Sequence, residues 1–185
     1  THGITNADVE EELIKLQLAD YIFSCSPEVR KSLINAGIAE EKILDTSYGL
    51  RDSELAETVK PRRSDPEKPL TAIFVGSIGV RKGPHLLLDY WCRSGVKGCL
   101  RLIGDIDEEV RHLIAPYLER EDIEHIEYVD DLKPIYANAD VFILPSLEEG
   151  SPLVTYLALG AGLPCLVSPM GAGGVVSHGE TGLIM

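Results

Sequence analysis

The residues best suited to chemistry stand in a short loop between two apolar segments near the C-terminal end of the chain. Glu148 and Glu149 come first, and Ser151 and Pro152 follow. Because Ser is a preferred N-cap and Pro is favoured at the first helical position, we expect a helix over 152–160 capped by Ser151. Its unpaired N–H groups would seat an anion, and the carboxylates would accept hydrogen bonds from hydroxyl groups. Together they suit a nucleotide joined to a sugar. The alternative is that the two acids only complement the helix dipole.

A second loop, nearer the middle of the chain, has the composition of a phosphate-binding turn. Gly76, Gly79 and Gly83 would let the backbone approach a ligand closely, and Arg81 and Lys82 supply two cations just before an expected helix. Two cations at a strand-to-helix turn suit a diphosphate. The spacing matches neither G-x-G-x-x-G nor the Walker loop. A flexible turn with solvated charges is the alternative.

Strands and helices alternate regularly from residue 70 onward. We expect strands over 70–75, 99–103, 124–129, 140–145 and 164–168, and helices over 84–94, 107–119, 131–138 and 152–160. This alternation predicts an α/β fold with a Rossmann-like parallel sheet covered by helices on both faces. Ligands bind such sheets at the carboxyl ends of the strands, so both loops should lie at one edge.

The N-terminal part has too few elements to close a core by itself. Helices are expected over 8–19 and 27–35, and strands over 21–24 and 42–47. Two strands and two helices resemble the last part of a domain, so we expect the chain to be a fragment of a longer protein. Residues 51–69 are charged and rich in proline, which indicates a linker.

Composition excludes several other classes of protein. The net charge of −13 argues against a surface that binds nucleic acid or anionic lipid. No apolar run reaches the roughly 20 residues that span a bilayer. The absence of a G-x-G-x-x-G turn with a later acid disfavours a nicotinamide dehydrogenase. The spacing of the four cysteines does not fit a metal site, so we expect no bound metal. We expect reduced thiols, as in a cytoplasmic protein, at Cys25, Cys92, Cys99 and Cys165.

Several motifs, in order, resemble those of nucleotide-sugar glycosyltransferases of the two-domain B fold, family 4 of the retaining class. Residues 145–150 resemble the family's P-S-x-x-E-G stretch, and Val75-Gly76 with Lys82-Gly83 resembles its V-G-R…K-G loop. Three further matches cover most of the remaining chain: the Y-x-x-A-D ending at 136–140, the closing G-x-T-G turn within 171–182, and the end of an acceptor domain over 20–49.

The resemblance implies a different role for each part of the chain. Residues 1–50 would be the end of the acceptor-side domain, 51–69 a linker, and 70–185 a donor-binding domain truncated at its C-terminus. The reaction would transfer a sugar from a nucleotide diphosphate sugar to an acceptor hydroxyl on a glycan, lipid or small molecule. No other cofactor is implied, and membrane association would come only through parts not present here.

The resemblance also assigns roles to single residues. Lys82, with Arg81, would hold the donor diphosphate, and Glu149 would contact the donor sugar; these three are the predicted catalytic residues. Glu148, one position out of register, ranks lower. The other predicted donor-binding residues are Gly76, Ser77, Gly79, Gly83, Val129, which would lie near the nucleobase, Gly150, Ser151, Pro152, Leu153 and Leu157.

Two positions depart from the family pattern. Ser77 stands where the family has arginine, a role that Arg81 could take over. Leu157 stands where the family has a second glutamate that accepts hydrogen bonds from the ribose, and an unpaired buried hydroxyl costs about 1–3 kcal/mol. These departures keep an alternative open, in which the chain is a degenerate glycosyltransferase-like domain that acts as a binding or assembly module.

Overall fold

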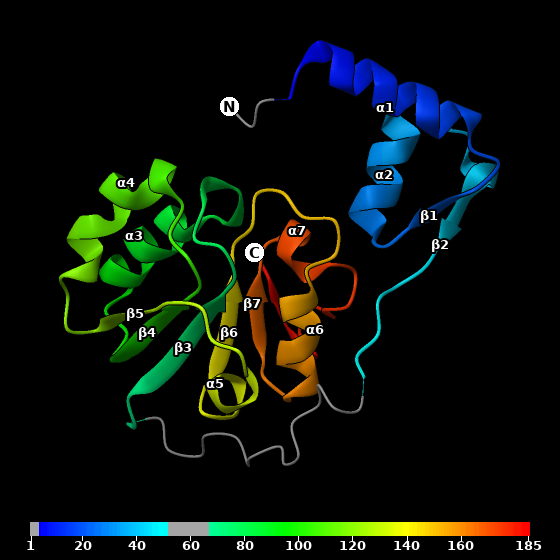
Figure 1. The fold of residues 1–185 in the computed structure, drawn as a ribbon. Helices are drawn as coiled ribbons and strands as arrows, with labels where there is room; N and C mark the ends of the chain where they lie inside the picture. The colour runs from blue at the N-terminus through cyan, green and yellow to red at the C-terminus, as the bar shows by residue number, and fades with distance from the viewer. Residues whose placement is uncertain (1–3, 52–66) are drawn as a thin grey trace.

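The computed structural model describes residues 4–51 and 67–185, which contain two parallel β-sheets (Figure 1). The smaller sheet pairs β1 (Ile22–Ser24) with β2 (Ile43–Asp45). The larger sheet has the order β5-β4-β3-β6-β7-β8, in which every neighbouring pair is parallel. Its strands are β3 (Leu70–Val75), β4 (Gly98–Ile103), β5 (Ile123–Ile126), β6 (Val141–Leu144), β7 (Cys165–Val167) and β8 (Gly182–Ile184). The predicted Rossmann-like parallel sheet is therefore confirmed. Residues 52–66 of the predicted linker lie outside the described part of the chain.

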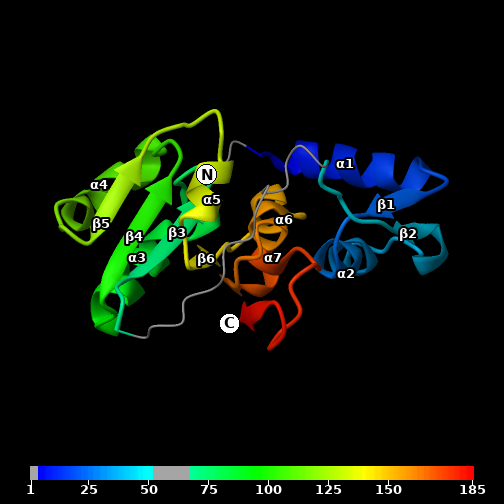
Figure 2. The same cartoon turned by 90° about the horizontal axis from the view of Figure 1, so that it is seen from below.

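Helices cover both faces of the larger sheet (Figures 1 and 2). On one face lie α3 (Pro84–Ser94) and α4 (Glu108–Leu118), and on the other α5 (Lys133–Ala137), α6 (Leu153–Gly160) and the short α7 (Pro169–Ala172). The smaller sheet carries α1 (Asn6–Leu18) and α2 (Pro27–Asn35), and a 3-10 turn, η1 (Glu40–Lys42), precedes β2. Residues 4–51 are called the β1–β2 unit below, and residues 67–185 the six-stranded unit.

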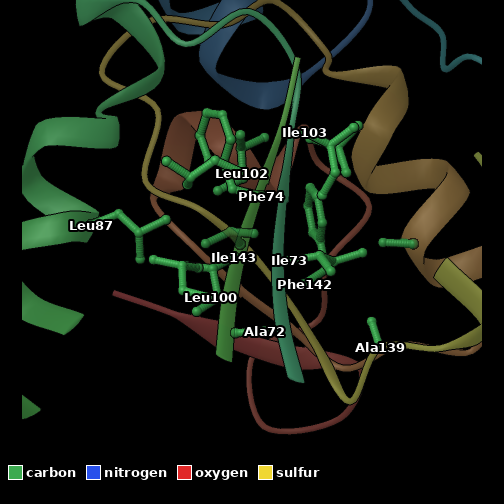
Figure 3. Close-up of a cluster of buried hydrophobic side chains, with 14 of the residues drawn as sticks. Ala72, Ile73, Phe74, Leu87, Leu100, Leu102, Ile103, Ala139, Phe142 and Ile143 are labelled. Atoms are coloured by element: carbon green, nitrogen blue, oxygen red, sulfur yellow. The ribbon is translucent and has the colours of Figure 1, made fainter. Parts of the chain in front are cut away.

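The core of the six-stranded unit follows from the period of two in its strands. Ile73, Phe74, Leu100 and Leu102 are fully buried, and successive residues point to opposite faces of the sheet (Figure 3). Both faces are covered, so nearly every position of these strands is apolar. Leu87 of α3 packs against one face and Phe142 lies on the other.

The β1–β2 unit is held together by helix caps and a few buried residues. Thr5 and Asp8 form a capping box at the start of α1. The helix was predicted, but none of its residues is buried: Val9 is 48% exposed, and Leu13 and Leu16 are half-buried. Ser26 caps α2 by accepting a hydrogen bond from Val29 N–H at 3.3 Å.

The order of the strands creates a reversal between β3 and β6. From β3 the chain moves outward through β4 to β5, then returns to β6 on the other side of β3 and moves outward again. Ligands of open parallel sheets bind at such a reversal, outside the carboxyl ends of the strands. The loops that follow Val75 and Leu144 flank it, and these are the two loops that the sequence singled out.

Candidate functional site

The loop after β3 is anchored to the end of β4 before it reaches its two cations. Gly76 N–H donates to Ile103 O at 2.9 Å, and Ile78 N–H donates to Asp105 O at 2.8 Å. A 3-10 turn, η3 (Val80–Lys82), then carries both cations to the start of α3. The predicted position of the cations, just ahead of this helix, is confirmed.

Gly83 brings this loop against the loop that follows β6. It has a φ of 68°, in the left-handed region that favours glycine. A Cβ atom placed there would lie 2.4 Å from Pro145 O, so only a glycine lets the two backbones come this close. Two further hydrogen bonds join the loops, because Arg81 O accepts from Leu147 N–H at 2.7 Å and from Glu148 N–H at 3.3 Å.

Lys82 and Glu149 form an ion pair between the two loops. Lys82 Nζ lies 2.6 Å from Glu149 Oε1, and the two side chains are only 23% and 12% exposed. The buried Ser146 hydroxyl donates to the same carboxylate oxygen at 3.2 Å, and Ser168 Oγ in turn donates to Ser146 O. The carboxylate of Glu149 is therefore held by groups from two loops, and Ser168 anchors the backbone of one of them. Arg81 pairs more loosely with Glu148, at 3.5 Å, and both side chains are exposed.

A cavity of about 250 Å³ opens beside this ion pair. Its lining includes five of the predicted site residues together with two acids that the sequence reasoning missed, Asp107 and Glu109: Ser77, Gly79, Arg81, Lys82, Asp107, Glu109 and Glu149. The missed acids follow β4, whose carboxyl end lies beside that of β3. The sheet-edge rule that identified the other loops could have found them.

Ser77 and Asp107 explain how the loop accommodates serine in place of arginine. Ser77 Oγ donates to the Asp107 carboxylate, at 3.0 Å from Oδ1 and 3.1 Å from Oδ2. A Cβ atom at Gly79 would lie 2.0 Å from Asp107 Oδ2, so the glycine makes room for this acid. The lining of the cavity therefore carries the Asp107 carboxylate as well as that of Glu149.

The prediction that Ser151 caps α6 is wrong. The helix begins at Leu153, its N-cap is Pro152, and no side chain caps it. Ser151 Oγ instead shares a hydrogen bond with Tyr156 Oη at 3.0 Å and donates to Gly173 O at 3.4 Å. Because the Ser151 hydroxyl bonds these two groups, it does not accept a hydrogen bond from the first turn of α6. The backbone N–H groups of the first turn still face the loop.

The remaining predicted residues are not among those that line the cavity. Gly76 lies under the aliphatic part of Lys82, since a Cβ atom there would be 3.0 Å from its Cε. Leu157 is half-buried and packs against the core. Val129 follows β5, which ends at Ile126, three residues earlier than expected. Gly150 and Leu153 are exposed, and Pro152 is buried. The binding roles of all these residues stay predictions.

Charges of both signs meet at this edge of the sheet. Lys82 and Arg81 already have carboxylate partners, so an anionic ligand must compete with Glu149 and Glu148 for them. Within residues 4–51 and 67–185, no group of three His, Cys, Asp or Glu side chains could hold a metal ion. In the same residues no helix is both long enough and apolar enough to cross a bilayer.

Comparison with curated proteins shows relatives of one kind. The chain is 29% identical to sulfoquinovosyl transferase SQD2 of Arabidopsis thaliana over 191 aligned residues, which cover 90% of the chain and 34% of the relative. It is 31% identical to an uncharacterized glycosyltransferase of Haemophilus influenzae, covering 62% of the chain and 34% of the relative. The chain thus spans about a third of the length of these relatives.

Solved structures share the fold at low sequence identity. The Anabaena protein HepE, in complex with UDP and glucose, superimposes with a TM-score of 0.77 at 18% identity, covering 98% of this chain and 54% of that one. Sucrose-phosphate synthase from Thermosynechococcus elongatus gives 0.79 at 21% identity, covering 98% and 49%. Both matches extend over the β1–β2 unit as well as the six-stranded unit. The model of the family "Glycosyl transferases group 1" matches residues 69–185, and the chain belongs to this family.

Proposed function

We propose that the chain is part of a retaining glycosyltransferase of family 4, which moves a sugar from a nucleoside diphosphate to an acceptor hydroxyl. The observation that carries the proposal is the meeting of Lys82 and Glu149, from separate loops, at the strand reversal. At that point a cation suited to a diphosphate is hydrogen-bonded directly to a fixed carboxylate suited to sugar hydroxyls.

In this proposal the leaving diphosphate governs the chemistry. Breaking the bond between sugar and diphosphate builds negative charge on the phosphate oxygens, and groups that stabilise this charge lower the barrier. Lys82 and Arg81 would supply positive charge, and the first turn of α6 would supply backbone N–H groups. Glu149 would orient the sugar by accepting hydrogen bonds from its hydroxyl groups. No metal is needed for these roles, because the two side chains carry the charge.

We also propose that the two units have different substrates. Residues 70–185 would bind the donor, and residues 1–50 would belong to the acceptor side, joined by 51–69. A second cavity, of about 350 Å³, lies between the units and supports this division; Ser26, Arg30, Asp45 and Gly174 are among its lining residues. The acceptor hydroxyl would approach Glu149 from this side, because Gly150 contacts Ser26 directly.

The second candidate is a degenerate domain that binds a partner without turnover. Two observations favour it: Ser77 is engaged by Asp107, and Leu157 packs against the core. A domain of this kind would not bind nucleotide sugars, so donor binding discriminates between the two candidates.

The experiment that tests the proposal is a thermal-shift screen of the chain against matched pairs of ligands. Each pair is a nucleoside diphosphate and its glucose conjugate, with UDP, ADP and GDP as the nucleotides. A ligand that binds only the folded state raises the melting temperature. We expect stabilisation by one pair, stronger for the conjugate than for the free diphosphate. No shift with any pair would contradict the donor site and favour the binding module.

Replacing Glu149 by glutamine should change the affinity for the free diphosphate and the affinity for its glucose conjugate by different amounts. Glutamine keeps the shape of the side chain but removes the charge that now neutralises Lys82, so the free diphosphate should bind about threefold to tenfold more tightly. The conjugate should gain less, because an amide accepts hydrogen bonds from sugar hydroxyls more weakly than a carboxylate. Calorimetric titration of the wild type and Glu149→Gln measures both affinities. Equal changes for the two ligands would show that Glu149 does not contact the sugar.

A further inference from the structure

One hydrogen bond joins the loop that carries Glu149 to the other unit of the chain. Ser26 Oγ, at the start of α2, donates to Gly150 O at 2.6 Å. Ser26 is 7% exposed because it lies where the β1–β2 unit meets the six-stranded unit, next to Gly150 and Gly174. The same hydroxyl accepts a hydrogen bond from Val29 N–H, so a single oxygen caps α2 and contacts the loop.

Two further contacts join the units close to this hydrogen bond. The Tyr48 ring lies edge-on to Tyr156, with centroids 6.4 Å apart, and Tyr156 Oη is bonded to Ser151. A Cβ atom at Gly174 would lie 2.6 Å from Pro27 Cδ, so the two units touch there too. The β1–β2 unit therefore contacts the loop after β6 and the turn after α7.

Glu149 stands between two anchors that come from different units. On its N-terminal side, the backbone of Leu147 and Glu148 is bonded to Arg81 O of the six-stranded unit. On its C-terminal side, Gly150 O is held by Ser26 of the β1–β2 unit. Without the Ser26 contact, the carbonyl group next to Glu149 would lose the bond that fixes its direction, and small displacements of a positioning group are costly.

We infer that Ser26 is a positioning residue, through which α2 of the β1–β2 unit holds Glu149 in the orientation that contacts the donor sugar. The inference rests on the proposed function, since it assumes a sugar beside Glu149. If Ser26 has this role, the part of the donor affinity that comes from the sugar depends on the β1–β2 unit. The diphosphate part depends on Lys82, which is anchored entirely within the six-stranded unit.

The test uses three substitutions of Ser26 that separate its two hydrogen bonds. Alanine removes both bonds. Aspartate is also a good N-cap but cannot donate to Gly150 O at neutral pH, so it keeps the cap and loses the contact. Threonine keeps both. Calorimetry with UDP and with UDP-glucose measures the affinity of each variant, and circular dichroism confirms that each is folded.

Ser26→Ala and Ser26→Asp should both weaken UDP-glucose binding by about threefold to tenfold, the range for one lost hydrogen bond, with UDP affinity unchanged within about twofold. Ser26→Thr should restore the wild-type ratio of the two affinities. Equal losses for UDP and UDP-glucose, or no loss in folded Ser26→Asp, would overturn the positioning role while leaving the donor site intact. Failure of the wild type to bind any of the UDP, ADP and GDP pairs would instead contradict the proposed donor site.

Discussion

Replacing Lys82 by alanine should weaken the binding of a nucleoside diphosphate by about 10- to 100-fold, the range for losing a hydrogen bond to a charged group. The substitution removes Lys82, the less exposed of the two cations that line the cavity. It leaves the Glu149 carboxylate, which is 12% exposed, without a cation partner. That carboxylate would then repel the phosphates instead of sharing a cation with them. Calorimetric titration with UDP measures the loss.

Arg81→Ala is the matched control for this prediction. Arg81 is the adjacent cation of the same turn, but its side chain is 52% exposed and its contact with Glu148 is long. Solvent screens such a charge, so its removal should cost less than about tenfold in affinity. Equal effects of the two substitutions would show that the turn attracts the ligand only through net charge. A larger effect of Arg81→Ala would exchange the two proposed roles.

Replacing Gly83 by alanine should disrupt both the fold and the site. The residue has a positive φ, and the new Cβ atom would lie 2.4 Å from a backbone oxygen that cannot move without its strand. We expect the free energy of unfolding to fall by about 2–4 kcal/mol, which combines backbone strain with the clash. The loops after β3 and β6 must also separate, so diphosphate affinity should fall by more than about tenfold. Thermal unfolding and calorimetry measure the two effects.

Gly95→Ala provides the control at the other end of the same helix. Gly95 has a φ of 66°, almost the same as Gly83, but no atom lies within 4 Å of its added Cβ. The change therefore isolates backbone strain, worth about 1–2 kcal/mol. Diphosphate affinity should stay within about twofold of the wild type. If Gly83→Ala is no worse than Gly95→Ala, close contact between the two loops is not a requirement of the fold.

Strong local signals allowed most of the six-stranded unit to be predicted from sequence. The bounds of β3 and α3 are those expected, because Pro69, Gly76, Gly83 and Pro84 delimit them. The strand expected over 124–129 ends at Ile126 because its partner β4 turns away at Gly104, which has a φ of 136°. Pairing with a distant strand sets that boundary, and no local pattern records it.

The candidate site was predictable as a location but not as a set of contacts. The edge rule for parallel sheets placed Lys82 and Glu149 together, although 67 residues separate them. Two features depended on tertiary contacts: the hydroxyl of Ser151 bonds Tyr156 instead of the helix start, and Asp107 turns toward Ser77. Helical periodicity likewise predicted α1, but a period does not say what covers the apolar face, and no residue of this helix is buried.

The central claim is that the loops after β3 and β6 form one site for the donor diphosphate. The most direct measurement is the change in amide NMR shifts of the isotopically labelled chain on titration with UDP. We predict that Gly79, Lys82 and Gly83 shift together with Gly150 and Leu153, at one common affinity. Shifts confined to the opposite end of the sheet, around the cavity of Leu159 and Thr181, or different affinities for the two loops, would contradict the claim.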